Sequence, residues 1–223
     1  MTVPLVDFSS MTPVRPANHF YGSYGKRAID LILVALAAPV ILPVLAIILV
    51  VTALGGGKPL YIQRRIGRGG REFRCWKVRT MVRNADGVLA KMIATDADMA
   101  AEWHCNQKLV NDPRITRFGR LLRRSSLDEL PQLWNVLTGD MSLVGPRPFT
   151  PDQKELYAEG RGDAAYYALR PGISGLWQVS RRNAGSFAER VHYDELYGRD
   201  LSFTADLHIL WRTCAVVLMA TGL

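Results

Sequence analysis

Residues 31–54 of this 223-residue chain read LILVALAAPVILPVLAIILVVTAL, an apolar run without a single charge. Roughly 20 apolar residues are enough to cross a bilayer as a helix, so the run is long enough to do so. Three glycines at residues 55–57 end it. The run predicts a tail at residues 1–24, a membrane segment at residues 25–57 and one compact domain at residues 58–223.

Two prolines, Pro39 and Pro43, lie in the middle of the apolar run. Each removes a backbone donor and disfavours helical geometry in the residue before it, so we expect the helix to break at Ala38 and Pro39. Basic residues flank both ends of the run, and such residues favour the cytoplasmic side. A re-entrant helix-hairpin that enters and leaves through one leaflet satisfies both flanks. A kinked helix that spans the bilayer is the alternative.

Asp30 lies at the membrane edge of this segment. An ionisable side chain at that position is costly without a partner. Lys26 and Arg27 precede it by about one helical turn, so the spacing predicts a local ion pair at this edge, with Lys26 and Asp30 as the membrane-edge pair.

The whole composition combines a net charge of +8 with 48% hydrophobic residues. This combination is typical of proteins that meet polyanions or an anionic membrane surface. No recognised nucleic-acid motif is present, so we expect no nucleic-acid partner. The three cysteines are far apart in sequence and indicate neither a disulfide framework nor a zinc site.

Residues 123–132 read RRSSLDELPQ and place two adjacent carboxylates, Asp128 and Glu129, between an arginine pair and an apolar helix that ends near Gly139. The helix has two plausible starts. With Ser126 as the N-cap, Glu129 completes a capping box. With Asp128 as the N-cap, Pro131 falls in the first turn, where its missing N–H costs little. Either start places the carboxylates at the positive end of a helix, which favours their ionised form and attracts phosphate.

Other segments predict the rest of the fold. Strand-like runs at residues 60–65 and 72–78 flank a glycine-rich turn and predict a β-hairpin. Residues 84–103 predict a helix, and residues 207–223 predict a core or interface-lying helix that is too short to span. The expected class is α+β, mainly helical, with the Pro-broken membrane helix ahead of the compact domain.

Several side chains could bind phosphate or a nucleotide. Arg123 and Arg124 end a basic helical run directly before the carboxylates and could clamp phosphate oxygens. Residues 142–148, SLVGPRP, predict a rigid loop that presents Arg147 between two prolines. Trp177 and Gln178 could stack on and hydrogen-bond a base or sugar, although a buried structural tryptophan fits the pattern equally well.

These motifs, together with KVRTM at residues 77–81 and RPG at residues 170–172, resemble the bacterial sugar transferases, monotopic polyprenyl-phosphate phosphoglycosyl transferases. The resemblance covers roughly residues 25 to 223. It implies a membrane protein of the bacterial inner membrane, with its catalytic domain on the cytoplasmic face, that acts in exopolysaccharide or related glycan synthesis. The implied substrates are a UDP-sugar and undecaprenyl phosphate, and a homodimer is a reasonable assembly.

By this resemblance, Asp128 is the nucleophile that forms a phosphosugar ester, and Asp128 and Glu129 hold Mg²⁺. Arg147, with Arg123 or Arg124, would bind phosphate. Lys77 and Arg79 are weaker candidates for the same pocket. Some members carry a serine before the kinking proline, whereas this chain has Ala38 there.

The C-terminal segment looks most like members that act on simple hexoses, so UDP-glucose or UDP-galactose is the expected donor. The alternative function is a non-enzymatic basic protein that binds the membrane surface or recruits a partner. It leaves unexplained why the pair Asp128 and Glu129 lies between arginines and a helix start.

Overall fold

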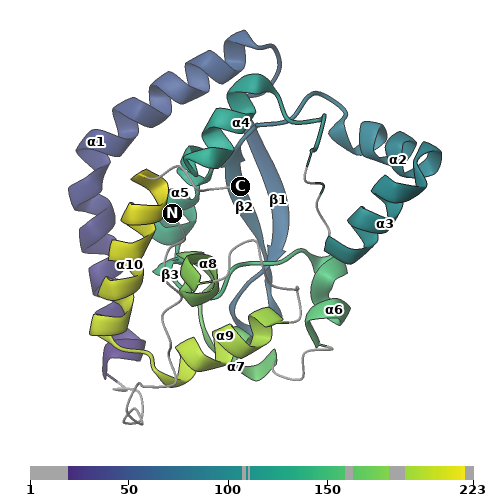
Figure 1. Cartoon of the computed structure of the whole chain (residues 1–223). Coiled ribbons are helices and arrows are strands. Elements are labelled where there is room, and N and C mark those ends of the chain that lie inside the picture. The colour runs from purple at the N-terminus through teal and green to yellow at the C-terminus, as the bar shows by residue number, and fades with distance from the viewer. Residues whose placement is uncertain (1–19, 107–108, 110, 159–162, 181–188, 219–223) are drawn as a thin grey trace.

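The computed structural model describes residues 20–106, 109, 111–158, 163–180 and 189–218. Helices dominate this part of the chain, with two small two-stranded sheets (Figure 1). The helices are α1 (Lys26–Leu54), α2 (Ala85–Thr95), α3 (Ala97–Asn106), α4 (Arg117–Arg124), α5 (Gln132–Thr138), α6 (Lys154–Ala158), α7 (Asp163–Ala168), α8 (Leu176–Ser180), α9 (Glu189–Arg199) and α10 (Phe203–Leu218). The strands are β1 (Leu60–Ile66), β2 (Glu72–Val78), β3 (Ser142–Val144) and β4 (Gly172–Ser174). The predicted α+β class, mainly helical, is confirmed.

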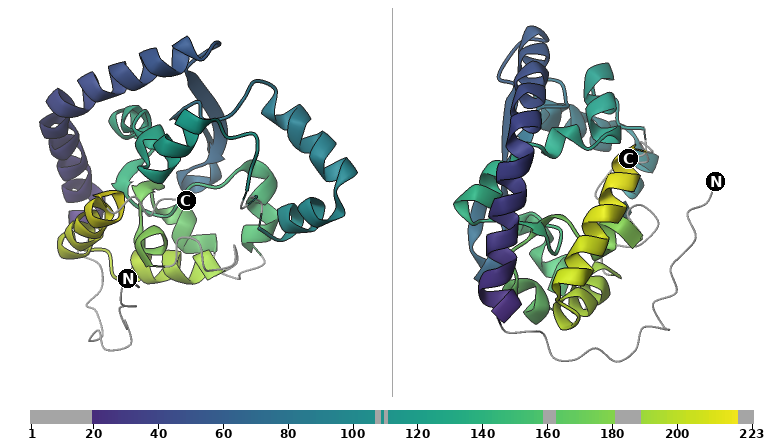
Figure 2. Two further views of the ribbon diagram at one scale, coloured as in Figure 1. Left: turned by 45° about the horizontal axis from the view of Figure 1, so that its top comes forward. Right: turned by 90° about the vertical axis from the view of Figure 1, so that its left-hand side faces the viewer.

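Helix α1 runs along the outer edge of the molecule as one helix of 29 residues (Figure 1). Pro39 and Pro43 lie inside it, and the helix continues through both. The left view of Figure 2 shows that it bends in its middle, so that its purple and blue halves run in different directions. Proline bends a helix because it removes an intrahelical hydrogen bond and crowds the preceding turn. The break expected at Ala38 and Pro39 is therefore a bend within a continuous helix.

The surface of α1 is apolar. Among the described residues, Tyr21–Leu54 is the one helical stretch that is long and apolar enough to cross a membrane. Its side chains are largely exposed, including Leu36, Val40 and Leu54. The helix already starts before residue 25, with a π-helical turn at Tyr21–Gly25, so part of the predicted tail is helical. Residues 1–19 lie outside the described residues.

The two charged side chains at the base of α1 anchor it to the domain, and the predicted ion pair between them is wrong. Lys26 donates to Asp206 at 2.6 Å, at the start of α10. Asp30 accepts from the Ser142 hydroxyl at 2.7 Å and from the Leu143 backbone N–H at 3.1 Å. Both side chains are buried against the domain, where these partners satisfy them better than a pairing along the helix surface would.

The predicted β-hairpin is confirmed. Strands β1 and β2 pair antiparallel, with Tyr61 opposite Lys77, Gln63 opposite Cys75 and Arg65 opposite Phe73. Residues that lie directly opposite one another in an antiparallel pair point to the same face. Arg65 and Lys77 therefore share a face with Cys75, which is completely buried.

The start of the segment predicted as a rigid loop, residues 142–148, instead forms a short parallel sheet with residues 172–174. Ser142 in β3 pairs with Gly172 in β4, and Val144 pairs with Ser174. The strands can approach because Gly145 has no side chain: a Cβ added there would lie 2.3 Å from the Arg170 carbonyl oxygen. Neither segment shows the alternating pattern of a longer strand, so the sequence did not reveal the pairing.

A buried aromatic cluster holds the chain that follows Arg147. Phe149 stacks on Tyr157 with ring centroids 4.6 Å apart, and its backbone carbonyl accepts from the Ile66 N–H at 2.9 Å. The Tyr166 hydroxyl donates to the Ile66 carbonyl at 2.7 Å. The end of β1 and the segment after Arg147 are thereby joined.

Two helix boundaries differ from the prediction. Residues 84–103 form parts of two helices, because the Asp96 carboxylate accepts from the backbone N–H groups of Asp98 and Met99, each at 3.0 Å, and so caps a new helix. Helix α10 starts at Phe203 rather than at residue 207. The Ser202 hydroxyl caps this earlier start, because it accepts from the Ala205 N–H at 3.2 Å. Residues 219–223 lie outside the described residues.

Candidate active site

The adjacent carboxylates lie in a separate short turn ahead of helix α5. Leu127–Glu129 form a 3₁₀ turn, and α5 begins only at Gln132. Ser126 adopts a left-handed conformation with φ of 57° and makes no capping hydrogen bond to the turn. Ser126 occupies the N-cap position of this turn without the predicted capping bond, and α5 itself has Pro131 at its N-cap position, so neither predicted register describes the start of α5. The turn aims two consecutive side chains at the body of the domain, and both are buried.

Glu129 is clamped by two cations. Its Oε1 atom accepts from the Lys77 ammonium at 2.8 Å and from the Arg147 guanidinium at 3.0 Å. Burial by itself would raise the pKa of Glu129, but Arg147 and Lys77 outweigh burial and hold the pKa well below its usual range. Glu129 is therefore ionised throughout the physiological range. These cations, rather than the predicted helix terminus, keep it charged.

Asp128 lies in a different environment, although it is the next residue. Its side chain accepts no hydrogen bond from any described residue, and the residue is 8% exposed. Burial raises the pKa of Asp128; Lys77 opposes this shift, whereas the charge of Glu129 adds to it. The expectation that a helix terminus lowers this pKa is wrong. A poorly solvated carboxylate without a protein partner is suited to act as a nucleophile.

The loop that carries Arg147 brings its guanidinium to Glu129. Pro146 and Pro148 flank the arginine and fix the backbone on both sides. The side chain is 32% exposed and forms an ion pair with Glu129. Its other N–H donors have no partner among the described residues and can meet a bound anion.

The two arginines that precede the turn differ in place. Arg123 donates from Nε to the Thr80 hydroxyl at 2.9 Å and lies close enough to Asp128 to interact with its charge. Arg124 is exposed and forms no ion pair within the described ranges. Gly119 lets α4 pack tightly against this segment, since a Cβ there would lie 2.0 Å from the Thr80 carbonyl oxygen. This packing places Arg123 beside Thr80 and Asp128, whereas Arg124 is not brought to the site.

The two predicted basic residues at the end of β2, Lys77 within the strand and Arg79 just after it, also separate. Lys77 reaches Glu129, whereas Arg79 donates to the Thr52 carbonyl at 3.1 Å, near the end of α1. Side chains that are two residues apart share a face only while the strand continues, and β2 ends at Val78. Arg79 therefore ties the segment after β2 to the C-terminal end of α1.

Trp177 and Gln178 lie at the start of α8. The Arg190 guanidinium packs over the Trp177 ring at 5.1 Å, while the Trp177 indole N–H is buried without a partner. Gln178 donates to the Ile173 carbonyl at 3.3 Å, and its side-chain oxygen is also buried and unpaired. Both side chains thus have hydrogen-bonding groups that the described residues do not satisfy.

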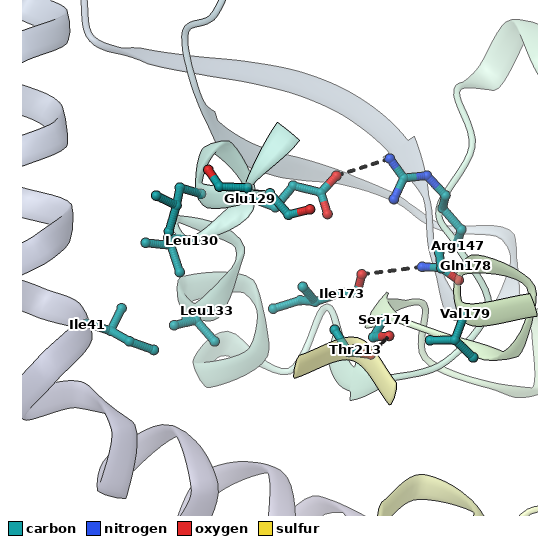
Figure 3. A pocket seen from close by; sticks show the side chains of 13 residues that line it. Ile41, Glu129, Leu130, Leu133, Arg147, Ile173, Ser174, Gln178, Val179 and Thr213 are labelled. Atoms are coloured by element: carbon teal, nitrogen blue, oxygen red, sulfur yellow. Dashed lines mark hydrogen bonds and ion pairs between the residues drawn. The ribbon is translucent and has the colours of Figure 1, made fainter. Parts of the chain in front are cut away.

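A pocket of about 200 Å³ opens beside the carboxylates (Figure 3). Glu129 and Arg147 face one another along one edge of it, and Gln178 lies below them. Ile41 of α1, Leu130 and Leu133 line the opposite side. Asp128 does not line the pocket itself. The pocket therefore connects an apolar wall, which includes the middle of α1, with the charged end of the site.

Two residues near the site were not predicted. Arg65 shares the Lys77 face of the hairpin and interacts electrostatically with Arg147 and Glu129. Asn135 ties α5 to β2, because its amide donates to the Arg74 carbonyl at 2.7 Å and its oxygen accepts from the Trp76 N–H at 3.1 Å. Period-two alternation along the hairpin could have indicated Arg65, since it places Arg65 and Lys77 on one face.

The carboxylate pair could hold Mg²⁺ only together with ligands from a bound substrate. Mg²⁺ usually takes one or two protein carboxylates and completes its shell with substrate phosphates and water. Asp128 and Glu129 supply two such groups, although one oxygen of Glu129 is already occupied by cations. Within the described residues, no group of three or more histidine, cysteine, aspartate or glutamate side chains could hold an ion. The residues fit Mg²⁺ when phosphate oxygens supply the remaining ligands.

Comparisons with known proteins show which family this chain resembles over nearly its whole length. The family model described as "Bacterial sugar transferase" matches residues 21–220. The UDP-galactose-lipid carrier transferase of Erwinia amylovora is 47% identical over 198 residues, which are 88% of this chain and 41% of that protein. The undecaprenyl-phosphate galactose phosphotransferase of Salmonella typhimurium is 43% identical over 198 residues, which are likewise 88% of this chain and 41% of that protein.

A shorter relative matches along most of its own length. The exopolysaccharide production protein ExoY of Rhizobium meliloti is 41% identical over 202 residues, which are 90% of this chain and 88% of that protein. The chain spans about two fifths of the length of the first two relatives and most of the length of this one. On the evidence of the family match and these identities, the chain belongs to the bacterial sugar transferase family.

Proposed function

We propose that this protein transfers a phosphosugar from a UDP-sugar to undecaprenyl phosphate, releasing UMP and forming undecaprenyl-diphosphate-sugar. The observation that carries the proposal is the contrast within the carboxylate pair. Asp128 is a buried carboxylate without a partner, and Glu129 beside it is clamped by Lys77 and Arg147 at the charged end of an apolar pocket. The names of the relatives point to the same substrates.

In the first step, an oxygen of the Asp128 carboxylate attacks the phosphorus that carries the sugar. The bond from this phosphorus to the oxygen that bridges the two phosphates breaks, and its electron pair leaves with UMP. The sugar phosphate is then esterified to Asp128. The buried position of Asp128 supports this role, because few water molecules can compete for the ester.

In the second step, a phosphate oxygen of undecaprenyl phosphate attacks the same phosphorus. The bond to the Asp128 oxygen breaks, the carboxylate is regenerated, and the lipid leaves with a diphosphate-linked sugar. Donor and acceptor therefore react in turn at one site, which is a ping-pong mechanism. The acceptor phosphate can reach the charged end of the pocket while its hydrocarbon lies against the apolar wall.

The cations supply charge neutralisation. Phosphoryl transfer depends on positioning and on stabilising charge over the phosphate oxygens. Arg147 has free donors for those oxygens, and Arg123 lies beside Asp128. Lys77 acts mainly through Glu129, which keeps the cations in place. Mg²⁺ held by Asp128 and Glu129 would neutralise further charge on the diphosphate.

The membrane segment brings this chemistry to the lipid. We propose that α1 enters and leaves the cytoplasmic leaflet of the inner membrane as a re-entrant hairpin with the domain on the cytoplasmic face. The bend in its middle and the basic residues at both ends support this arrangement (Figure 2). Ile41 lies just after Pro39 and lines the pocket, so the bent region borders the reaction site.

UDP-galactose is the first candidate donor, and UDP-glucose is the second. Two of the relatives carry galactose in their names. Trp177 and Gln178 have unsatisfied polar groups that could contact the donor. A homodimer is compatible with this function and is part of the proposal.

A UMP-release assay tests the proposal. Purified protein in detergent is mixed with undecaprenyl phosphate, Mg²⁺ and each member of a UDP-sugar panel. We expect UMP release and a diphosphate-linked lipid with one hexose donor, and neither product from the Asp128→Asn variant. Lipid binding without UMP release from any donor would support the non-enzymatic membrane-binding function instead.

A further inference from the structure

Arg65 is a part-buried guanidinium that makes no direct contact with a carboxylate among the described residues. Its two terminal nitrogens donate to neutral oxygens, one to the Pro148 carbonyl at 2.9 Å and one to the Gln63 side chain at 2.6 Å. Its Nε atom is fully buried and makes no hydrogen bond. No ion pair to Arg65 occurs within the described residues. A buried cation in this state is costly to the fold.

The surroundings increase this cost. Burial lowers the pKa of Arg65 and the positive charge of Arg147 lowers it further, whereas Cys75 and Glu129 oppose this shift only in part. A neutral donor such as glutamine could satisfy the Pro148 carbonyl without either penalty. The positive charge of Arg65 is therefore not explained by its hydrogen bonds.

A second arginine holds the same loop. Arg190 donates to the carbonyl of Arg147, and Arg65 donates to the carbonyl of the next residue, Pro148. Two guanidiniums thus donate hydrogen bonds to consecutive backbone carbonyls of the segment that carries Arg147. Because both flanking residues are prolines, this backbone has few N–H groups with which to hold itself.

The charges around the loop do not balance. The cations that interact with the carboxylates around the site are Arg65, Lys77, Arg114, Arg123, Arg147 and Arg190, and the carboxylates are Asp112, Asp128, Glu129 and Asp194. Six cations against four carboxylates leave an excess of two positive charges. A diphosphate diester, as in a nucleotide sugar, carries two negative charges and would offset this excess.

We propose that Arg65 is a positioning residue for diphosphate binding: it holds the Arg147 loop through Pro148 and supplies positive charge that the diphosphate of the nucleotide sugar balances. This inference rests on the proposed function. It separates two roles of Arg65, since a purely structural anchor would need the hydrogen bond but not the charge.

The test compares ligands with and without the diphosphate. Binding of UDP and of uridine is measured by calorimetry for the full chain and for Arg65→Gln, which keeps a donor and loses the charge. We expect Arg65→Gln to weaken UDP binding roughly tenfold, the loss typical of one charged interaction, with uridine binding unchanged. The loss should shrink at high salt, because salt screens the charge. In turnover assays, KM for the UDP-sugar should rise more than kcat falls.

Arg64→Gln is the matched control. Arg64 is the adjacent arginine on the opposite face of β1, its side chain is 79% exposed, and its pairing with Glu72 spans 3.4 Å. The same charge change there should leave UDP binding unchanged. Equal weakening of UDP and uridine by Arg65→Gln, or no weakening of either, would overturn the inference.

Arg65→Lys gives a result even if Arg65→Gln does not fold. It retains the charge and loses the planar fork, so we expect UDP binding within about threefold of the original protein. A loss as large as that expected for Arg65→Gln would mean that geometry rather than charge matters, and would refute the inference. UMP release by the unmodified protein tests the proposed function separately. If that activity is present and Arg65→Gln binds UDP normally, only the role of Arg65 fails.

Discussion

Asp128 and Glu129 are consecutive residues, yet only Glu129 is held by cations. Lys77 and Arg147 both donate to Glu129, whereas Asp128 has no hydrogen-bond partner among the described residues. Burial acts on both side chains, but it prevails only at Asp128, whose pKa it raises. The short turn that carries them therefore separates one carboxylate that organises the site from one that is available to react.

The first prediction concerns the pH dependence of turnover. Because the pKa of Asp128 is raised, this carboxylate gains its proton at a higher pH than an ordinary aspartate does. The pKa of an ordinary aspartate is about 3.9. The nucleophile should be lost as the pH falls through that raised value. We expect the acidic limb of kcat, measured by UMP release, to lie above the ordinary value. A limb at or below it would show that Asp128 is not perturbed in this way.

The second prediction is that the two carboxylates affect stability in opposite directions. The folded state binds a proton at Asp128 more tightly than the unfolded state does, so its ionised form destabilises the fold at neutral pH, and this cost disappears as the pH falls through the raised pKa. Glu129 has a lowered pKa, so it contributes stability above its unfolded pKa and loses it as the pH falls through the folded value.

Neutralising each residue tests this difference by denaturant unfolding at neutral pH. Asp128→Asn should raise the free energy of unfolding. Glu129→Gln should lower it by about 2 kcal/mol, because Lys77 and Arg147 lose a charged acceptor. The same sign for both variants would contradict the opposite environments of the pair.

The third prediction concerns the anchor of α1. Asp206 accepts from Tyr21 at 2.6 Å, from Lys26 at 2.6 Å and from Tyr197 at 2.7 Å. Asp206→Asn leaves the buried Lys26 ammonium without a carboxylate, so we expect a loss of about 3 kcal/mol in thermal unfolding and faster proteolysis near the base of α1. Asp200→Asn is the control, because its pair with Arg199 is partly exposed and should contribute less than about 1 kcal/mol.

How much the sequence predicts depends on the range of the contact. The hairpin, the apolar helix and the proline-flanked presentation of Arg147 follow from local patterns, because strand alternation and prolines act on neighbouring residues. The candidacy of Lys77 comes from the family resemblance alone. The partner of Lys26 could not be predicted, since Asp206 lies 180 residues away.

The turn at Asp128 shows a different limit. Ser126 adopts a left-handed conformation that a serine seldom takes, so capping rules alone place the helix start too early. The exposed position of Arg124 likewise depends on how α4 packs against Thr80 through Gly119, which no local pattern records.

The fourth prediction concerns membrane topology. In a cysteine-free variant in membrane vesicles, single cysteines at Thr12 and at Lys58 are labelled with an impermeant maleimide. A re-entrant α1 places both ends on one side, so both positions should label from the same side. Labelling from opposite sides would show that α1 spans the bilayer and would reject the hairpin.

The most direct test of the mechanism is the intact mass of the protein after incubation with its UDP-sugar and Mg²⁺ in the absence of lipid acceptor. The account predicts a mass increase of one phosphosugar, located on Asp128, absent from Asp128→Asn and removed when undecaprenyl phosphate is added. An unmodified mass, from protein that turns over normally once the acceptor is present, would contradict the covalent mechanism.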